Sequence, residues 1–137
     1  MNGLMHLPIL PVVLPLFAGI VLLALRNAPL AVQRGGSLAA ALALIPLAIG
    51  VLQSVSDGTH LVYALGNWEA PFGIVLVADR LAAWMLLTTS LLAVFALLYA
   101  MRGIDVEGRH FHVLFQLQLF GLNGAFLTGD LFNLFVF

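Results

Sequence analysis

The sequence contains no cysteine and no lysine, and only 8% of its 137 residues are charged. Without cysteine, disulfide bonds and thiolate metal sites are excluded. Hydrophobic residues make up 63% of the chain, whereas soluble proteins typically have about 45–50% apolar and about 25% charged residues. A chain this short cannot bury so much apolar surface in a soluble core. We therefore predict an integral membrane protein with lipid as its solvent.

Features of soluble enzymes and of nucleic-acid-binding proteins are also missing. There is no glycine-rich phosphate loop, no spacing of His, Cys and Glu that suits a metal ion, and no basic patch. Ser90 has no base near it in the sequence, and His110 and His112 lie beside Arg109 at a helix start, a poor position for a buried haem. We expect no cofactor, no metal site, no nucleic-acid partner and no catalytic residue in this chain.

The chain does contain four long apolar runs, each close to the roughly 20 residues with which a helix crosses about 30 Å of hydrocarbon. These runs are residues 6–25, 36–55, 81–101 and 111–128. A fifth run, 130–137, rises only about 10 Å as a helix. We predict an all-α integral membrane domain over residues 1–137, with four transmembrane helices and the start of a fifth, and we expect the chain to continue beyond Phe137. The alternative is a four-helix protein whose short apolar tail lies in the interface.

The arginines indicate the orientation. Positive residues favour the cytoplasmic side of a membrane. Four arginines flank the first and third loops, whereas the second loop, residues 57–79, is bordered by Arg80 alone. We therefore expect the N-terminus, the second loop and the turn at 128–130 to be extracytoplasmic. The four cytoplasmic arginines are Arg26, Arg34, Arg102 and Arg109.

The second loop has the pattern of a β-hairpin. Two β-prone apolar runs, His60–Leu65 and Phe72–Ala78, surround the turn-forming segment Gly66–Pro71. Asp79 and Arg80 follow, where Asp79 suits the N-cap of the next helix and Arg80 suits contact with headgroup phosphates. The alternative is that Asp79 and Arg80 belong to an ion entrance route.

Prolines and small residues shape the first two helices. Pro15 lies deep enough to bend the first helix, so a neighbouring helix or a polar group must satisfy the carbonyl that it frees. Gly36 and Ala40 have the four-residue spacing at which small residues let helices approach closely.

The fourth run carries the most polar content. At about 100° per residue, His112, Gln116 and Asn123 fall within about 40° of one another on one helix face. Polar groups in a bilayer face the bundle interior or a water-filled cavity, so this face is a candidate ion path. The alternative is that these side chains hydrogen-bond neighbouring helices. Asp130 and Asn133 are further candidate ion-path residues near the start of the fifth run.

Three stretches carry a family resemblance. They are Gly66–Leu81, which begins Gly-Asn-Trp-Glu-Ala-Pro, Phe115–Asp130, which ends Phe-Leu-Thr-Gly-Asp, and Leu131–Phe137, which reads Leu-Phe-Asn-Leu-Phe-Val-Phe. Together they resemble the D subunit of Mrp-type multisubunit Na⁺/H⁺ antiporters, a family similar to the proton-pumping subunits of respiratory complex I. The resemblance covers the whole chain, and Leu117–Phe137 is its most specific part.

The resemblance implies a fold of about fourteen helices, of which this chain would be the N-terminal part. It also implies secondary transport of Na⁺ or K⁺ against H⁺ across the bacterial cytoplasmic membrane, in a hetero-oligomeric complex with other membrane subunits. In the family, a buried Glu pairs with a Lys on a later helix. That Glu would follow Asp130 by about two and a half turns and would lie beyond Phe137. The chain would then hold the scaffold and the entrance of the first ion half-channel.

Two other functions stay open from the sequence. A proton-pumping subunit of complex I, an NADH-quinone oxidoreductase, or of a membrane-bound hydrogenase would have the same fold and would make the chain part of an enzyme. A small structural subunit would have no ion path. The forms of the motifs at Gly66–Trp68 and Ala78–Leu81 favour the antiporter branch.

Overall fold

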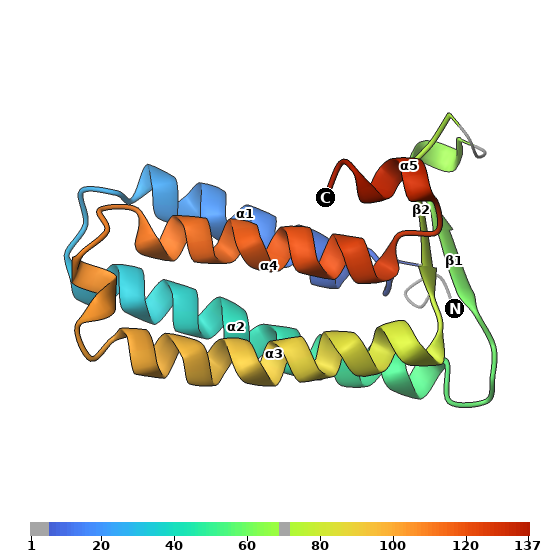
Figure 1. Cartoon of the computed structure of the whole chain (residues 1–137), viewed down its shortest axis with the longest axis horizontal. Coiled ribbons are helices and arrows are strands. Elements are labelled where there is room, and N and C mark those ends of the chain that lie inside the picture. Colours follow the sequence, from blue (N-terminus) through green and yellow to red (C-terminus); the bar gives the residue numbers. More distant parts are fainter. Residues whose placement is uncertain (1–5, 69–71) are drawn as a thin grey trace.

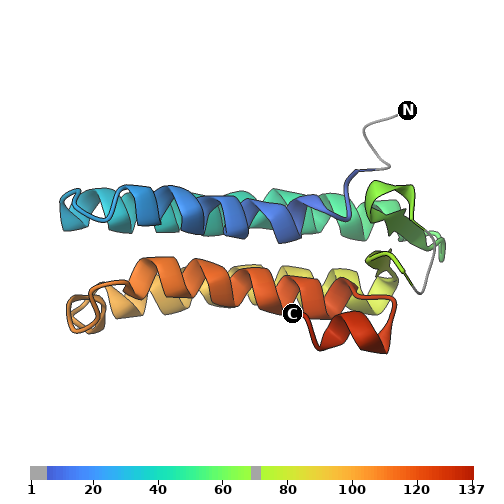
Figure 2. The same ribbon diagram turned by 90° about the horizontal axis from the view of Figure 1, so that it is seen from above.

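The computed structural model describes residues 6–68 and 72–137. Its long helices are α1 (Leu10–Ala24), α2 (Leu30–Ser54), α3 (Arg80–Ala100) and α4 (Phe111–Leu127). They run alternately in opposite directions, so that the α1–α2 and α3–α4 loops lie at one end of the bundle, which we call the loop end (Figure 1). α1 and α2 form one layer and α3 and α4 a second (Figure 2). α1 packs along α4, and α2 packs along α3.

Two helices begin several residues away from the starts of the predicted apolar runs. α2 begins at Leu30, six residues before the predicted residue 36, and Pro29 is its N-cap. Proline is well tolerated where a helix starts because an N–H there has no helical partner. The earlier start places Arg34 on the helix and not in the loop. α1 begins at Leu10, after a turn at residues 6–9.

The four helices differ in length. α2 and α3, with 25 and 21 residues, are long and apolar enough to cross a membrane. α1 and α4 are apolar but have 15 and 17 residues, which corresponds to a rise of about 22 and 26 Å. Large apolar side chains such as Phe17 on α1 and Phe95 on α3 point outward and are 65% and 66% exposed. Such surfaces suit contact with lipid or with other membrane helices.

A two-stranded antiparallel sheet covers the opposite end of the bundle, the sheet end (Figure 1). β1 (Leu61–Ala64) pairs with β2 (Val75–Ala78), within the predicted hairpin at 57–79. Gly66 and Asn67 have φ angles of 66° and 60°, a left-handed conformation that Gly and Asn adopt most readily. The predicted turn residues 69–71 lie outside the described residues.

The chain after α4 continues alongside the sheet. The Gly129 N–H donates to the Val75 carbonyl at 2.9 Å, and Thr128 forms a β-bridge with Leu76. A short helix, α5 (Leu131–Leu134), follows, where the sequence predicts a helical start at 130–137. The turn at 128–130 therefore lies at the same end of the bundle as the second loop.

Candidate functional site

The polar side chains of α4 point into the bundle. His112, Gln116 and Asn123 are 4%, 0% and 1% exposed. They lie on one side of the helix, as their spacing predicts. Each side chain bonds a different segment: the loop before α4, helix α2 and helix α1, respectively. The face is therefore a row of polar contacts to three other parts of the chain.

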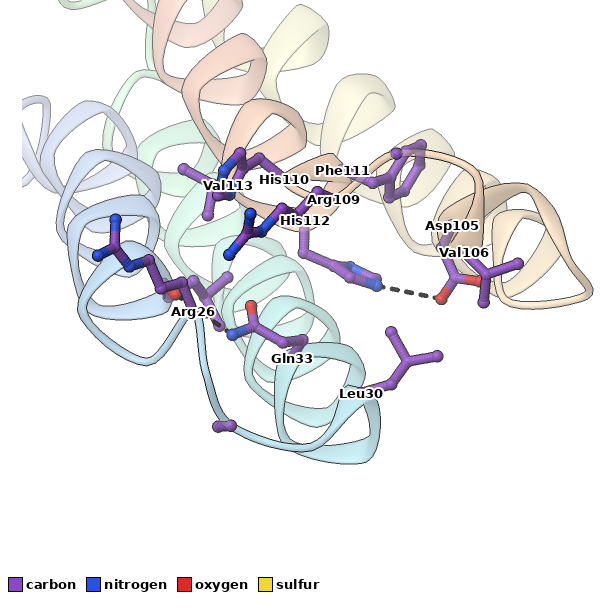
Figure 3. Close-up of a pocket in the computed structure, with 13 residues that line it drawn as sticks. Arg26, Leu30, Gln33, Asp105, Val106, Arg109, His110, Phe111, His112 and Val113 are labelled. Atoms are coloured by element: carbon purple, nitrogen blue, oxygen red, sulfur yellow. Dashed lines mark hydrogen bonds and ion pairs between the residues drawn. The ribbon is translucent and has the colours of Figure 1, made fainter.

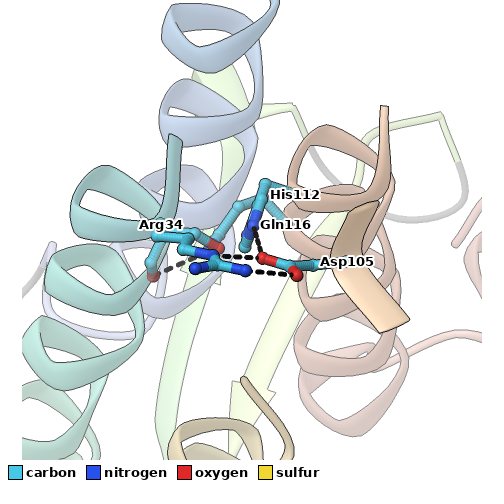
Figure 4. A network of polar contacts seen from close by, with 5 residues as sticks. Arg34, Asp105, His112 and Gln116 are labelled. Atoms are coloured by element: carbon cyan, nitrogen blue, oxygen red, sulfur yellow. Dashed lines mark hydrogen bonds and ion pairs between the residues drawn. The ribbon is translucent and has the colours of Figure 1, made fainter. Parts of the chain in front are cut away.

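At the loop end, Arg34 on α2 forms a two-pronged ion pair with Asp105 (Figure 4). Asp105 lies in the single 3₁₀ turn η2 (Ile104–Val106) between α3 and α4. Arg34 Nε donates to Asp105 Oδ2 at 2.6 Å, and Nη2 donates to Oδ1 at 2.8 Å. This parallel geometry is the strong form of a guanidinium–carboxylate contact. The Asp105 side chain is fully buried and that of Arg34 is 32% exposed, so the pair fastens the loop to α2.

His112 adds a third bond to the same carboxylate. Its Nε2 lies 3.1 Å from Asp105 Oδ2, and because a carboxylate only accepts hydrogen bonds, Nε2 carries the proton. The hydrogen bond from Arg34, followed by that from His112, lowers the pKa of the Asp105 carboxyl from its ordinary 3.8 to about 2, although burial acts in the opposite direction. Asp105 is therefore a fixed negative charge at neutral pH.

One turn further along both helices, Gln116 bonds Ser37. Gln116 Nε2 donates to the Ser37 carbonyl at 3.0 Å and to its Oγ at 2.9 Å. Both residues are completely buried. Ser37 follows Arg34 by three residues and Gln116 follows His112 by four, so each pair shares a helix face. Two successive polar contacts thus hold α2 beside the start of α4.

In the last third of α4, Asn123 satisfies a carbonyl that a proline has freed. Pro15 lies inside α1 and has no N–H to donate to the carbonyl of Pro11, four residues earlier. Asn123 Nδ2 donates to that carbonyl at 2.8 Å. The predicted need for a partner at Pro15 is confirmed, and the partner is a side chain of the polar face.

Each residue of the polar face also has one buried polar atom without a hydrogen-bond partner among the described residues. These atoms are His112 Nδ1, Gln116 Oε1 and Asn123 Oδ1. Buried polar atoms in proteins bond either to protein groups or to ordered water. The three atoms therefore mark positions along α4 at which water can bind.

Asp79 and Arg80 lie at the sheet end. Asp79 caps α3, because its Oδ1 accepts a hydrogen bond from the Ala82 N–H at 2.7 Å. Arg80 Nη2 donates to the carbonyl of Ser56, just beyond the end of α2. Both side chains therefore have local contacts that hold the ends of α2 and α3.

Asp130 and Asn133 also lie at the sheet end, away from His112. Asp130 caps α5 by accepting from the Phe132 N–H at 3.2 Å. Asn133 is 5% exposed, and its Nδ2 lies 3.5 Å from the Gly73 carbonyl oxygen. The predicted site residues therefore form two separate groups, with Asn123 between them.

The sequence interpretation did not include Asp105, Ser37 or the pairing role of Arg34. The sequence does contain a signal for this pairing. Arg34 and Ser37 are polar residues three apart, and His112 and Gln116 are polar residues four apart, so each pair lies on one face of its helix. Asp105 is an acid in a loop flanked by arginines. The predicted start of this helix at residue 36 puts Arg34 in a loop, so the sequence prediction misses the pairing of Arg34 with Asp105.

Known proteins resemble this chain along almost its whole length, although no model of a known protein family matches it. It is 49% identical over 137 residues to a probable K⁺/H⁺ antiporter D subunit of Rhizobium meliloti, covering 96% of this chain and 25% of the relative. It is 40% identical over 136 residues to a Na⁺/H⁺ antiporter D subunit of Alkalihalophilus pseudofirmus, covering 96% and 27%. The predicted resemblance is confirmed: this chain is a homologue of antiporter D subunits.

The structural comparison agrees with this assignment. The chain matches a chain of the Mrp complex from Dietzia sp. DQ12-45-1b with a TM-score of 0.84 and 30% identity, over 99% of this chain and 25% of the other. The homology to D subunits and the long apolar helices α2 and α3 make the chain a multi-pass membrane protein. It spans about a quarter of the length of the curated relatives it matches.

This chain is also similar to a subunit of a respiratory enzyme. The chain is 38% identical over 139 residues to the N subunit of NADH-quinone oxidoreductase from Desulforudis audaxviator, covering 96% of this chain and 27% of the relative. The similarity to complex I subunits that the sequence motifs indicate is therefore present as well.

Proposed function

We propose that this chain is part of the D subunit of a multisubunit antiporter, which exchanges Na⁺ or K⁺ for H⁺ across the bacterial cytoplasmic membrane together with other membrane subunits. The observation that carries the proposal is the 49% identity, over 96% of the chain, to a protein named as a K⁺/H⁺ antiporter D subunit. The 40% identical relative is named for Na⁺, so the proposal includes both cations.

The polar face of α4 is our candidate for the ion path within this chain. His112, Gln116 and Asn123 each have one buried atom at which water can bind. Gln116 and Asn123 are seven residues, or about 10 Å, apart along the helix, which is more than a single bridging water spans. Several waters, or side chains from elsewhere in the complex, must therefore connect them. Asp130 and Asn133 extend the candidate path toward the sheet end.

The orientation proposed from the arginines places the loop end in the cytoplasm and the N-terminus and sheet end outside. The positions of the loops support it, because Arg26, Arg34, Arg102 and Arg109 all belong to the loop end (Figure 1). His112 and its partners then lie at the cytoplasmic end of the candidate path, and Asp130 and Asn133 at its outer end.

Transport by inverted membrane vesicles tests both the function and the path. With the complete complex in a strain without antiporters of its own, addition of Na⁺ or K⁺ is expected to dissipate an established pH gradient. Gln116→Leu is expected to slow this exchange per assembled complex, because it removes a polar group from the buried face. Gln118→Leu, on the exposed side of the same helix, is the matched control.

Two results would contradict the proposal at different levels. If the complete complex shows no cation-dependent proton exchange, the antiport function is wrong. If exchange occurs but Gln116→Leu and Gln118→Leu have equal rates per complex, the α4 face is not part of the path.

The second candidate function is a proton-pumping subunit of an NADH-quinone oxidoreductase, which the 38% identity to the N subunit of such an enzyme favours. A complex of this kind moves protons only when an electron donor and a quinone are supplied. Cation-dependent exchange in vesicles without electron donor supports the antiporter. Proton movement that requires NADH or another donor supports the oxidoreductase.

A further inference from the structure

A cavity of about 240 Å³ opens between the two loops at the loop end (Figure 3). Arg26, just after α1, and Arg109, just before α4, both line it. Neither arginine forms an ion pair within the described part of the chain. Asp105 lines the same cavity, and its carboxylate is bonded to Arg34 and His112. Two guanidinium groups thus border the cavity without a described carboxylate partner.

An apolar track leads from this cavity along the outside of α4. A groove of about 420 Å³ shares Arg109 and Phe111 with the cavity and continues to Phe115. A second groove of about 270 Å³, between α3 and α4, begins at Phe115 and reaches Phe126. From Arg109 to Phe126 the chain rises about 25 Å, which exceeds the roughly 15 Å depth of one leaflet's hydrocarbon.

A third apolar groove lies next to the cavity, on the side of α1 and α2. It measures about 250 Å³ and shares Leu22 with the cavity. Gly36 and Ala40 on α2 form part of its wall, and the groove reaches Leu14 on α1, about 12 Å from Leu22 along the helix. The cavity therefore has two basic side chains in its lining and an apolar groove next to it on each side.

We propose that the cavity binds the phosphate of an anionic phospholipid, with one acyl chain in the two grooves along α4 and the other in the groove between α1 and α2. Guanidinium groups bind phosphate oxygens with paired hydrogen bonds, and basic pockets between transmembrane helices are suited to anionic headgroups. A soluble phosphate compound would use the arginines alone, whereas a lipid uses both the charges and the grooves. The proposal requires that the chain lies in a membrane and that the cavity and the grooves are open to lipid in the complete complex, and it is independent of the transported ion.

Lipid binding by the complete, delipidated complex in detergent tests the proposal by native mass spectrometry. The probes are phosphatidylglycerol, phosphatidylcholine and glycerol phosphate. We expect preferential retention of phosphatidylglycerol, and a loss of affinity of about fivefold for each of Arg26→Gln and Arg109→Gln. Arg102→Gln is the matched control, because Arg102 is an exposed arginine at the same end of the bundle and does not line the cavity.

A second pair of variants tests the grooves without a change in charge. Ala96→Leu fills part of the groove between α3 and α4, and it is expected to weaken phosphatidylglycerol binding. Ala39→Leu, at an exposed position on α2 that lines none of these grooves, is expected to leave binding unchanged.

Three outcomes would overturn the lipid site. Equal binding of phosphatidylcholine would show that the arginines do not select an anionic headgroup. Binding of glycerol phosphate as strong as that of the lipid would identify a soluble phosphate as the ligand. An equal loss in Arg102→Gln would show general attraction of anionic lipid to a basic surface.

Discussion

Pro15 leaves a backbone carbonyl without a hydrogen-bond donor, and Asn123 supplies that donor. The missing N–H of Pro15 leaves the Pro11 carbonyl without a helical partner, and in a bilayer no bulk water can replace it. Asn123 donates to this carbonyl from α4 at 2.8 Å. Its amide therefore has a packing role through Nδ2, while Oδ1 has no described partner and is the atom that can bind water.

The first prediction concerns this bond. Asn123→Leu is expected to lower the stability of the assembled complex by about 0.6–2 kcal/mol, the typical range for a hydrogen bond between membrane helices. Adding Pro15→Ala is expected to restore much of the loss, because the alanine can donate its own N–H to the Pro11 carbonyl. The amount of assembled complex and its resistance to heating measure both effects. A double variant as unstable as Asn123→Leu would contradict this role of Asn123.

Asp105 is a second residue whose surroundings change a measurable property, the pKa of its carboxyl group. Its pKa is lowered to about 2 in the folded protein, so the unfolded chain takes up a proton at a higher pH than the native chain does. Between those two values the unfolded state binds more protons, and folding stability rises with pH. The contribution of Asp105 is thus complete above pH 3.8 and is lost as the pH falls toward about 2.

The second prediction follows from this rise of folding stability with pH. The stability of the complex in detergent is expected to fall between pH 4 and pH 2, about the two pKa values of Asp105, and Asp105→Asn is expected to show a smaller fall because it has no titrating carboxyl there. Glu107→Gln, at an exposed acid two residues away, is the control and should retain the wild-type profile. Identical profiles for Asp105→Asn and wild type would argue against the ion pair.

At the scale of the elements, α1 and α2 approach closely at Gly36. A Cβ atom added at Gly36 would lie 3.0 Å from Cδ2 of Leu22 on α1, whereas one added at Gly35 would have no neighbour within 4 Å. The predicted role of Gly36 in close helix packing agrees with this contact. The two adjacent glycines therefore provide a direct comparison.

The third prediction uses this comparison. Gly36→Leu is expected to destabilise the pairing of α1 and α2 by about 1 kcal/mol, the low end of the usual cost of overpacking, because the Leu22 methyl group must shift while the rest of the new side chain enters the groove beside Ala40. Gly35→Leu is expected to have little effect, because its side chain enters open space. Thermal stability of the two variants in detergent checks the prediction, and equal stabilities of the two variants would show that the contact between Gly36 and Leu22 does not control this segment.

At the scale of the whole molecule, the two arginine-bearing loops meet at one end and the sheet joins the 128–130 turn at the other. The Arg34–Asp105 pair connects α2, just after the α1–α2 loop, with the loop between α3 and α4, and the Gly129–Val75 hydrogen bond connects the turn with the sheet. Each end of the bundle is therefore held by contacts between segments distant in sequence.

The fourth prediction concerns the direction of insertion. Because these 137 residues contain no native cysteine, each cysteine introduced here is a new labelling site, and the unaltered complex gives the background. Cysteines at Asn27 and Glu107 are expected to resist a membrane-impermeant thiol reagent in intact cells, and a cysteine at His60 is expected to react. His60 is a better test position than the nearby Asn67 because the φ angle of Asn67 is 60°, which a cysteine would strain. The reverse labelling pattern would invert the proposed orientation.

Much of this architecture follows from local sequence. The apolar runs require helices because only hydrogen-bonded helices or closed barrels satisfy the backbone in lipid. Gly66 and Asn67 supply the left-handed turn next to β1, and Pro15 creates a need for an external hydrogen-bond donor. The inward direction of His112, Gln116 and Asn123 follows from helical periodicity and the cost of exposing polar groups to lipid. These features depend on neighbouring residues and on the solvent, both of which a sequence reveals.

The identity of each partner depended on the tertiary structure. Arg34 and Asp105 are 71 residues apart, and Gln116 and Ser37 are 79 apart. A charged or amide side chain can bond any complementary group that packing brings near, so the sequence alone leaves these choices open. The basic cavity likewise forms only where two loops meet, from arginines that lie next to the ends of separate helices. The hydrogen-bonding needs of the chain are local, whereas the groups that meet them are selected by how the helices pack.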